Sequence, residues 1–106
     1  MLNNNIANDS NAWPFADVRN TASLTTTHVM VRGEPILRVT HDADDGTWQF
    51  HHGGIISTSD AFVVTLQEIY EHDSSVGELA DLPLGWQATR TAVGQHWLRQ
   101  QSPPAE

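Results

Sequence analysis

The strongest constraint on the fold of this 106-residue chain is a pair of alternating segments on either side of an acidic turn. In Ile36–His41 and again in Thr47–His52, bulky apolar residues alternate with polar ones, which is the period of a half-buried strand. Between them, residues 42–46 read Asp-Ala-Asp-Asp-Gly, and Asp-Gly is a strong hairpin signal. The pattern predicts a hairpin that turns Trp48 and Phe50 toward the core.

Other segments extend this sheet. Leu24–Val31 is rich in β-branched residues and alternates, so it predicts a strand that reaches the hairpin through a turn at 33–35. Gly85–Arg90 alternates again and is a fourth candidate strand. Val93–Gln100 closes the chain without a clear preference for helix or strand. Strands that follow one another in this way predict an antiparallel hairpin meander.

One helix is predicted over Ala61–Glu71, with Ser57–Asp60 supplying the residues that cap its start. Apolar residues recur there at spacings of three and four, which makes one apolar stripe: Phe62, Val63, Leu66, Ile69 and Tyr70. We therefore expect an α+β fold, with an antiparallel sheet of three to five strands and one main helix packed on the Trp48 and Phe50 face.

The domain organisation is simple. We expect a disordered, Asn-rich arm over residues 1–12, a single α+β domain over 13–101 and a frayed tail over 102–106. The chain has no cysteine and no apolar run of membrane-spanning length. We expect no secretory leader, because the first residues show no basic patch followed by an apolar stretch. These features favour the cytoplasm.

Charge indicates the kind of partner. Five Arg and no Lys stand against 13 acidic residues, a net charge of −8. Scattered Arg residues disfavour nucleic-acid binding, and nothing favours a membrane. A protein partner with a basic surface is the better electrostatic match. The candidate binding residues are the acidic side chains of the turn and of a later loop: Asp42, Asp44, Asp45, Glu78 and Asp81.

No catalytic group, cofactor or metal site is assigned from the residues. The acidic turn lacks the spacing of a calcium-binding EF-hand, and the chain has neither a nucleophile elbow nor a P-loop. One alternative is a metal-binding or small-ligand-binding protein that uses His41 and His52 with nearby acids. Another is a homodimeric accessory domain, since the sequence leaves the oligomeric state open. His28, His72 and His96 are isolated in the sequence.

Two segments carry a resemblance. His41–Phe50 is similar to a D-(D/S)-G-x-W-x-F hairpin, and Leu79–Arg90 is similar to an L-x-(D/A)-x-P-x-G-x-x-(A/F)-x-R segment. In this order, the stretch from Leu24 to Arg90 resembles a small bacterial family of unknown function that is grouped with immunity protein 33. The resemblance implies an intracellular domain that binds and neutralises a partner toxin, and it carries over no catalytic residue.

Overall fold

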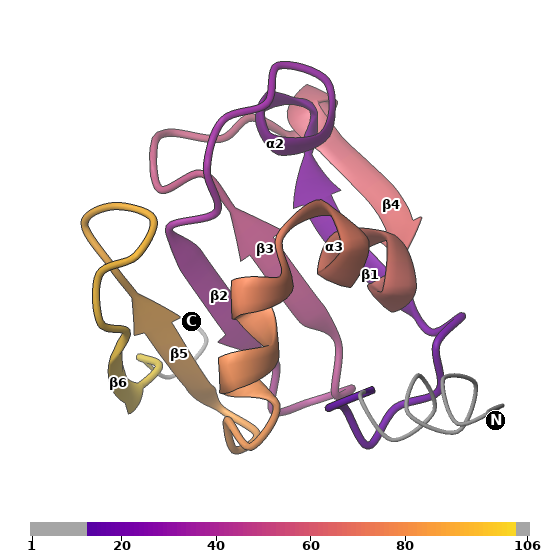
Figure 1. Cartoon of the computed structure of the whole chain (residues 1–106), viewed down its shortest axis with the longest axis vertical. Helices are drawn as coiled ribbons and strands as arrows, with labels where there is room; N and C mark the ends of the chain where they lie inside the picture. The colour runs from indigo at the N-terminus through magenta and orange to yellow at the C-terminus, as the bar shows by residue number, and fades with distance from the viewer. Residues whose placement is uncertain (1–12, 104–106) are drawn as a thin grey trace, which may run out of the picture.

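The computed structural model describes residues 13–103, which form a six-stranded mixed sheet with short helices (Figure 1). The strand order is β4-β1-β3-β2-β5-β6. The strands are β1 (Ala22–Thr26), β2 (Arg38–His41), β3 (Trp48–His51), β4 (Ala61–Thr65), β5 (Trp86–Thr89) and β6 (Leu98–Gln101). The α-helices are α2 (Thr27–Met30) and α3 (Leu66–His72), and the 3₁₀ helices are η1 (Thr58–Asp60) and η2 (Ser74–Leu79). The α+β class is confirmed.

The predicted hairpin is present. Strands β2 and β3 pair antiparallel, with Val39 opposite Phe50 and His41 opposite Trp48. Gly46 ends the acidic turn with a φ of +76°, a conformation that costs glycine little because it has no Cβ. Trp48 and Phe50 are both buried, so the bulky rings face the core as the alternation predicts.

The predicted meander is wrong at the first strand, and the sheet exceeds the expected three to five strands. The strand ends at Thr26, whose hydroxyl accepts a hydrogen bond from the Val29 amide and so caps the short helix α2. Helix α2 and the loop after it carry the chain past β3 to β2. As a result β1 lies parallel beside β3, and the sheet is mixed.

The predicted helix over Ala61–Glu71 is also wrong in its first half. Ala61–Thr65 is strand β4, paired antiparallel with β1 along its whole length. The helix starts at Leu66 because Thr65 and Glu68 form a capping box, in which the Glu68 carboxylate accepts from the Thr65 amide at 2.8 Å. Phe62 and Val63 consequently remain exposed.

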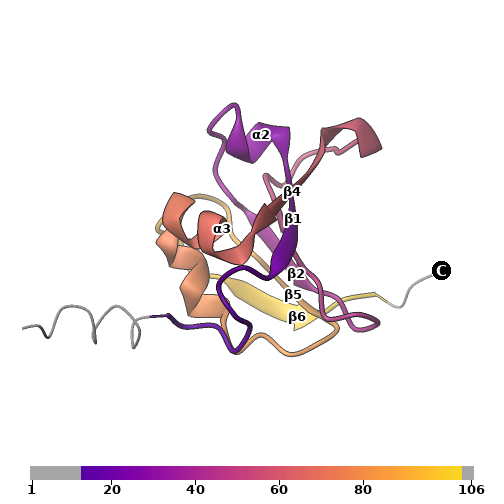
Figure 2. The same ribbon diagram turned by 90° about the vertical axis from the view of Figure 1, so that its right-hand side faces the viewer.

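One side of the sheet carries the core (Figure 2). Helices α3 and η2 lie on that side, where their apolar residues cover Trp48 and Phe50. Each fully buried Leu or Ile there stabilises the fold by about 1.5–3 kcal/mol. The buried apolar residues are Phe15, Val29, Ile36, Val39, Trp48, Phe50, Val64, Leu66, Ile69, Val76, Leu79, Leu82 and Ala88.

Arg90 ties the end of β5 to the start of η2. Its guanidinium pairs with Asp73 at 2.8 Å and donates to the Ser75 hydroxyl, while its Nε donates to the Ile36 carbonyl. Trp97 stacks over it, with the guanidinium carbon 4.1 Å from the ring centroid. Each of the three guanidinium nitrogens thus donates a hydrogen bond, and the charge is paired with Asp73, which explains why this Arg can be buried.

The chain ends are partly described. The segment Val93–Gln100, for which the sequence favours neither helix nor strand, contributes its last three residues to β6, and beyond this strand the Ser102 amide donates to the Gly85 carbonyl. The predicted arm over 1–12 and the tail from 104 lie outside the described residues. Within 13–103, no helix has the length and apolar character needed to cross a membrane.

Candidate functional site

The acidic turn packs against the segment that follows η2. Two hydrogen bonds join them: the Gly85 amide donates to the His41 carbonyl at 2.7 Å, and the His41 side chain donates from Nδ1 to the Leu82 carbonyl at 2.7 Å. The His41 ring also stacks on Trp48, 3.8 Å between centroids. His41 is therefore fixed from two sides and holds the base of the turn.

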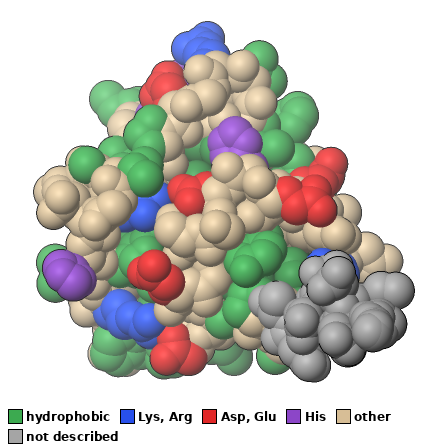
Figure 3. All heavy atoms as spheres, in the orientation of Figure 1, with side chains coloured by type: hydrophobic (Ala, Val, Ile, Leu, Met, Phe, Trp, Pro, Cys, Tyr) green, Lys and Arg blue, Asp and Glu red, His purple; other side chains and the backbone are tan. Residues whose placement is uncertain are grey.

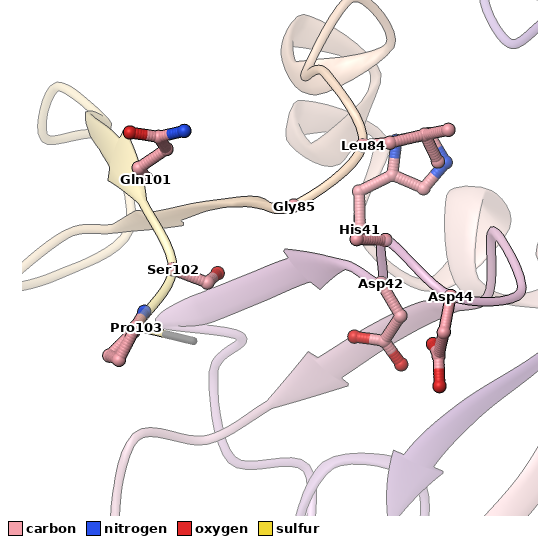
Figure 4. Close-up of a pocket in the computed structure, with 9 residues that line it drawn as sticks. His41, Asp42, Asp44, Leu84, Gly85, Gln101, Ser102 and Pro103 are labelled. Carbon is pink, nitrogen blue, oxygen red and sulfur yellow. The ribbon is translucent and has the colours of Figure 1, made fainter. Parts of the chain in front are cut away.

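This contact leaves an open hollow of about 730 Å³ at one end of the sheet (Figure 4). Asp42 and Asp44 extend their carboxylates in the same direction from the turn, while Gln101, Ser102 and Pro103 approach from β6. Leu84 also lines this hollow, with its side chain beside the His41 ring, and is 56% exposed. We call this region the acidic end; its lining residues are His41, Asp42, Ala43, Asp44, Leu84, Gly85, Gln101, Ser102 and Pro103.

Two of the three carboxylates in the turn accept hydrogen bonds from uncharged donors. Asp42 accepts from the Gln49 amide at 2.6 Å and from the Thr40 hydroxyl at 3.2 Å. Asp45 accepts from the Thr47 amide, which lowers the pKa of that carboxyl. The Arg ion pairs found within residues 13–103 go to Asp73 and Asp81. The turn thus keeps its negative charge available to a partner.

The later loop, which carries Glu78 and Asp81, lies at the same end of the sheet as the turn (Figure 1). Part of its negative charge is neutralised by an ion pair with Arg99. Arg99 pairs with Asp81 at 2.8 Å, which lowers the pKa of Asp81, and also donates to the Glu78 carbonyl oxygen. The Glu78 side chain is exposed. Of the five predicted binding residues, Asp42 and Asp44 line the hollow, Asp45 lies beside them in the turn, and Asp81 is compensated by Arg99.

A chain of hydrogen bonds on the other face of the sheet leads to Asp42. His51 Nε2 donates to the Gln49 side-chain oxygen at 3.0 Å, and Gln49 in turn donates to Asp42. Burial lowers the pKa of His51 to about 4, and the nearby Arg38 adds to this. His51 is therefore neutral near pH 7, where it helps to orient Gln49 and, through it, the Asp42 carboxylate.

The structure separates the two histidines of the metal-binding alternative. His41 lies opposite Trp48 at the start of β3, whereas His52 follows the end of that strand. Four residues of extended chain span about 13 Å, so His41 and His52 cannot bind one ion together. His52 instead stacks on His28, 4.0 Å between centroids, and both lie near Glu34.

Sequence reasoning missed this second cluster because its members come from three separate segments. Parallel pairing of β1 with β3 brings the carboxyl ends of both strands to one end of the sheet, where α2 and residue 52 come next in the chain. No local spacing encodes that pairing. We call His28, Glu34, His52 and the neighbouring Asp60 the histidine end.

Among the described residues, the helix-bearing face shows no comparable group of charged side chains. Its acidic side chains are interspersed with Arg and apolar side chains (Figure 3). The two ends of the sheet are accordingly the candidate sites of the described chain.

Comparison with known proteins adds no further information on function. No family model matches the chain, and neither a curated protein nor a solved structure matches it. The resemblance to the immunity protein 33 family stays a prediction.

Proposed function

We propose that this protein is a non-catalytic binding domain that engages a basic surface of a protein partner through its acidic end. Following the resemblance in sequence, the proposed role is that of a bacterial, cytoplasmic immunity-type protein and the partner is a toxin that it neutralises. The observation that carries the binding proposal is the open hollow that Asp42 and Asp44 line together with the exposed Leu84.

The hollow matches the chemistry of an Arg or Lys side chain. Such a side chain has an apolar stem and a cationic head, and it can lay the stem on Leu84 while the head meets the carboxylates. Asp42 already has fixed orientation through Gln49 and Thr40, so it loses little freedom when a cation binds. These contacts favour a positively charged protrusion on the partner.

The overall charge supports the same assignment. A net charge of −8 attracts a basic partner over a distance of about a Debye length and raises the rate of encounter, most of all at low salt. Interactions of this type contribute more to association rate and specificity than to affinity. A partner should therefore bind faster at low ionic strength than at high ionic strength.

A tri-arginine peptide tests the site because it presents the cationic side chains of a basic surface in their simplest form. We expect the peptide to shift backbone resonances of Asp42, Asp44 and Leu84 in a low-salt NMR titration. Asp44→Asn should weaken the peptide about 2- to 5-fold, as expected for one exposed charge pair. Glu71→Gln on α3 removes the same charge from another exposed position and is the matched control.

Shifts spread evenly over all exposed acids, or equal losses in Asp44→Asn and Glu71→Gln, would show that the acidic end is not a distinct site. A trialanine peptide controls for effects that do not depend on the cationic side chains.

A further inference from the structure

The histidine end brings three metal-ligating side chains together from three parts of the chain. His28 lies in α2, Glu34 in the loop after it, and His52 directly after β3. One ligand atom from each lies within 4.8 Å of the other two. The backbone fixes this arrangement, because the Glu34 amide donates to the His28 carbonyl at 2.9 Å and folds the loop back over α2.

The separation of two of the ligand atoms already suits a zinc ion. His28 Nδ1 lies 3.2 Å from a Glu34 carboxylate oxygen. Two ligand atoms that bind a tetrahedral zinc at 2.0–2.1 Å lie about 3.3 Å apart. An ion can therefore bind both atoms without displacement of either residue's backbone.

His52 supplies an imidazole nitrogen that lacks a protein partner. Its Nδ1 is buried and makes no hydrogen bond within the described residues. Its Nε2 lies against Gly54, where a Cβ would come within 2.9 Å. Because a buried polar atom without a partner costs free energy, coordination of an ion by Nδ1 would remove that cost. A rotation of the ring out of its stack on His28 would direct the lone pair toward the ion.

Asp60 provides the outer support that metal-binding histidines usually have. Its carboxylate lies 3.5 Å from His28 Nε2, on the opposite side of the ring from Glu34. When His28 binds an ion through Nδ1, its Nε2 carries the proton and faces this carboxylate. Asp60 is itself held in place, because its carboxylate accepts hydrogen bonds from the Ser57 amide and the Ser57 hydroxyl.

From this geometry we propose that His28, Glu34 and His52 form a zinc site, with Asp60 orienting His28. Two imidazoles and one carboxylate are ligands that zinc accepts, whereas Ca²⁺ and Mg²⁺ prefer sets made of oxygen atoms. Three protein ligands leave the fourth tetrahedral position for a water molecule or for a side chain of another protein. The Glu34 side chain is 42% exposed, so this ligand is in contact with solvent.

The test is a zinc titration of the untagged full-length chain, followed by calorimetry and by the ¹⁵N resonances of the histidine rings. We expect one zinc per chain and shifts of the His28 and His52 ring nitrogens, with His41, His72 and His96 unchanged. Ca²⁺ and Mg²⁺ at the same concentrations should shift none of them.

Variants identify the ligands. Glu34→Gln keeps the shape of the side chain and should weaken zinc at least about 10-fold, and His28→Asn and His52→Asn should do the same. Asp60→Asn should weaken zinc by about 10-fold as an orienting residue. The matched controls are Glu71→Gln and His72→Asn, which remove an exposed acid and an exposed imidazole on α3 and should leave affinity unchanged.

Three results would overturn the site: zinc that does not saturate, zinc affinity unaffected by Glu34→Gln in a variant with native circular dichroism, or shifts centred on His41. If His52→Asn fails to fold because the ring packs on Gly54, Glu34→Gln and His28→Asn decide the question. The zinc site and partner binding are separable, because Asp44→Asn should leave zinc affinity unchanged and Glu34→Gln should leave the tri-arginine titration unchanged.

Discussion

Both ends of the sheet hold acidic residues and histidine, yet the fold uses them in different ways. At the acidic end, His41 is locked between Trp48 and the Leu82 carbonyl, and the carboxylates of Asp42 and Asp44 face an open hollow. At the histidine end, both Glu34 and Asp60 lie next to His28, and His52 stacks on the same ring. The first arrangement leaves negative charge facing an open hollow, and the second gathers potential ligand atoms around one point.

The difference arises from strand direction. The carboxylates of the acidic end come from a hairpin turn between two antiparallel strands, so Asp42 and Asp44 are close in sequence and extend in the same direction from one tight bend. The histidine end is built from the connections that leave two parallel strands, and parallel neighbours require long connections. Those connections bring residues from distant segments together, which is how a set of ligands can converge.

The largest expected effect concerns the ring that supports the acidic end. Trp48→Ala removes a side chain that is 1% exposed and packs on Phe15 and His41. We expect a loss of about 3–5 kcal/mol in the free energy of unfolding, measured with urea. Leu98→Ala, at a site 65% exposed on β6, should change it little. A loss below about 1 kcal/mol for Trp48→Ala would mean that the acidic end does not depend on this packing.

The second prediction concerns His51, the neutral histidine that contacts Asp42 through Gln49. The folded-state pKa of His51, about 4, lies below its ordinary value of 6.5, so the unfolded chain binds the proton more readily. Its contribution to stability is full above pH 6.5 and is lost as the pH falls toward 4. Between pH 7 and 4.5 we expect this group to account for about 1–2 kcal/mol of the lost stability.

His51→Gln tests this assignment, because Gln keeps a donor near Gln49 and does not titrate. Its stability should fall less steeply with acid than that of the unchanged chain. His96→Gln, at an exposed position, should leave the slope as it is. Parallel pH profiles for His51→Gln and the unchanged chain would show that His51 does not contribute to the acid sensitivity.

The smallest expected effects compare one carboxylate from each end. Asp44→Asn should change the free energy of unfolding by less than about 0.5 kcal/mol, because it is an exposed turn residue. Asp60→Asn should lower the melting temperature more, since it weakens contacts with Ser57 and His28. Thermal melts without metal measure both. Equal melting temperatures would show that the histidine end is no better organised than the acidic end.

Local patterns predict much of the fold and only part of the sites. Alternation places Trp48 and Phe50 on the buried face, and the Asp-Gly turn sets the hairpin, because both depend on neighbouring residues. The same kind of information is present at Thr65 and Glu68, whose spacing is that of a capping box, but the apolar stripe from Phe62 to Tyr70 indicates a longer helix. Pairing with β1 overrides that helical periodicity in residues 61–65.

The features that local patterns do not predict depend on pairing between distant strands. The position of β1 beside β3 depends on contacts between segments about 25 residues apart in the register Leu24 to Gln49, which no short window contains. His28 therefore looks isolated in the sequence, and the hairpin pattern groups His52 with His41. The acidic end is easier to anticipate because most of its carboxylates are neighbours in one turn.

One NMR titration series tests the division between the two ends most directly. Histidine-ring and backbone resonances are recorded for the same untagged sample, first with zinc and then with tri-arginine peptide at low salt. We predict that zinc shifts His28 and His52 but not Asp42 or Asp44, and that the peptide shifts Asp42, Asp44 and Leu84 but not the rings of His28 and His52. Zinc and peptide acting on one common set of residues would contradict the separation of the two sites.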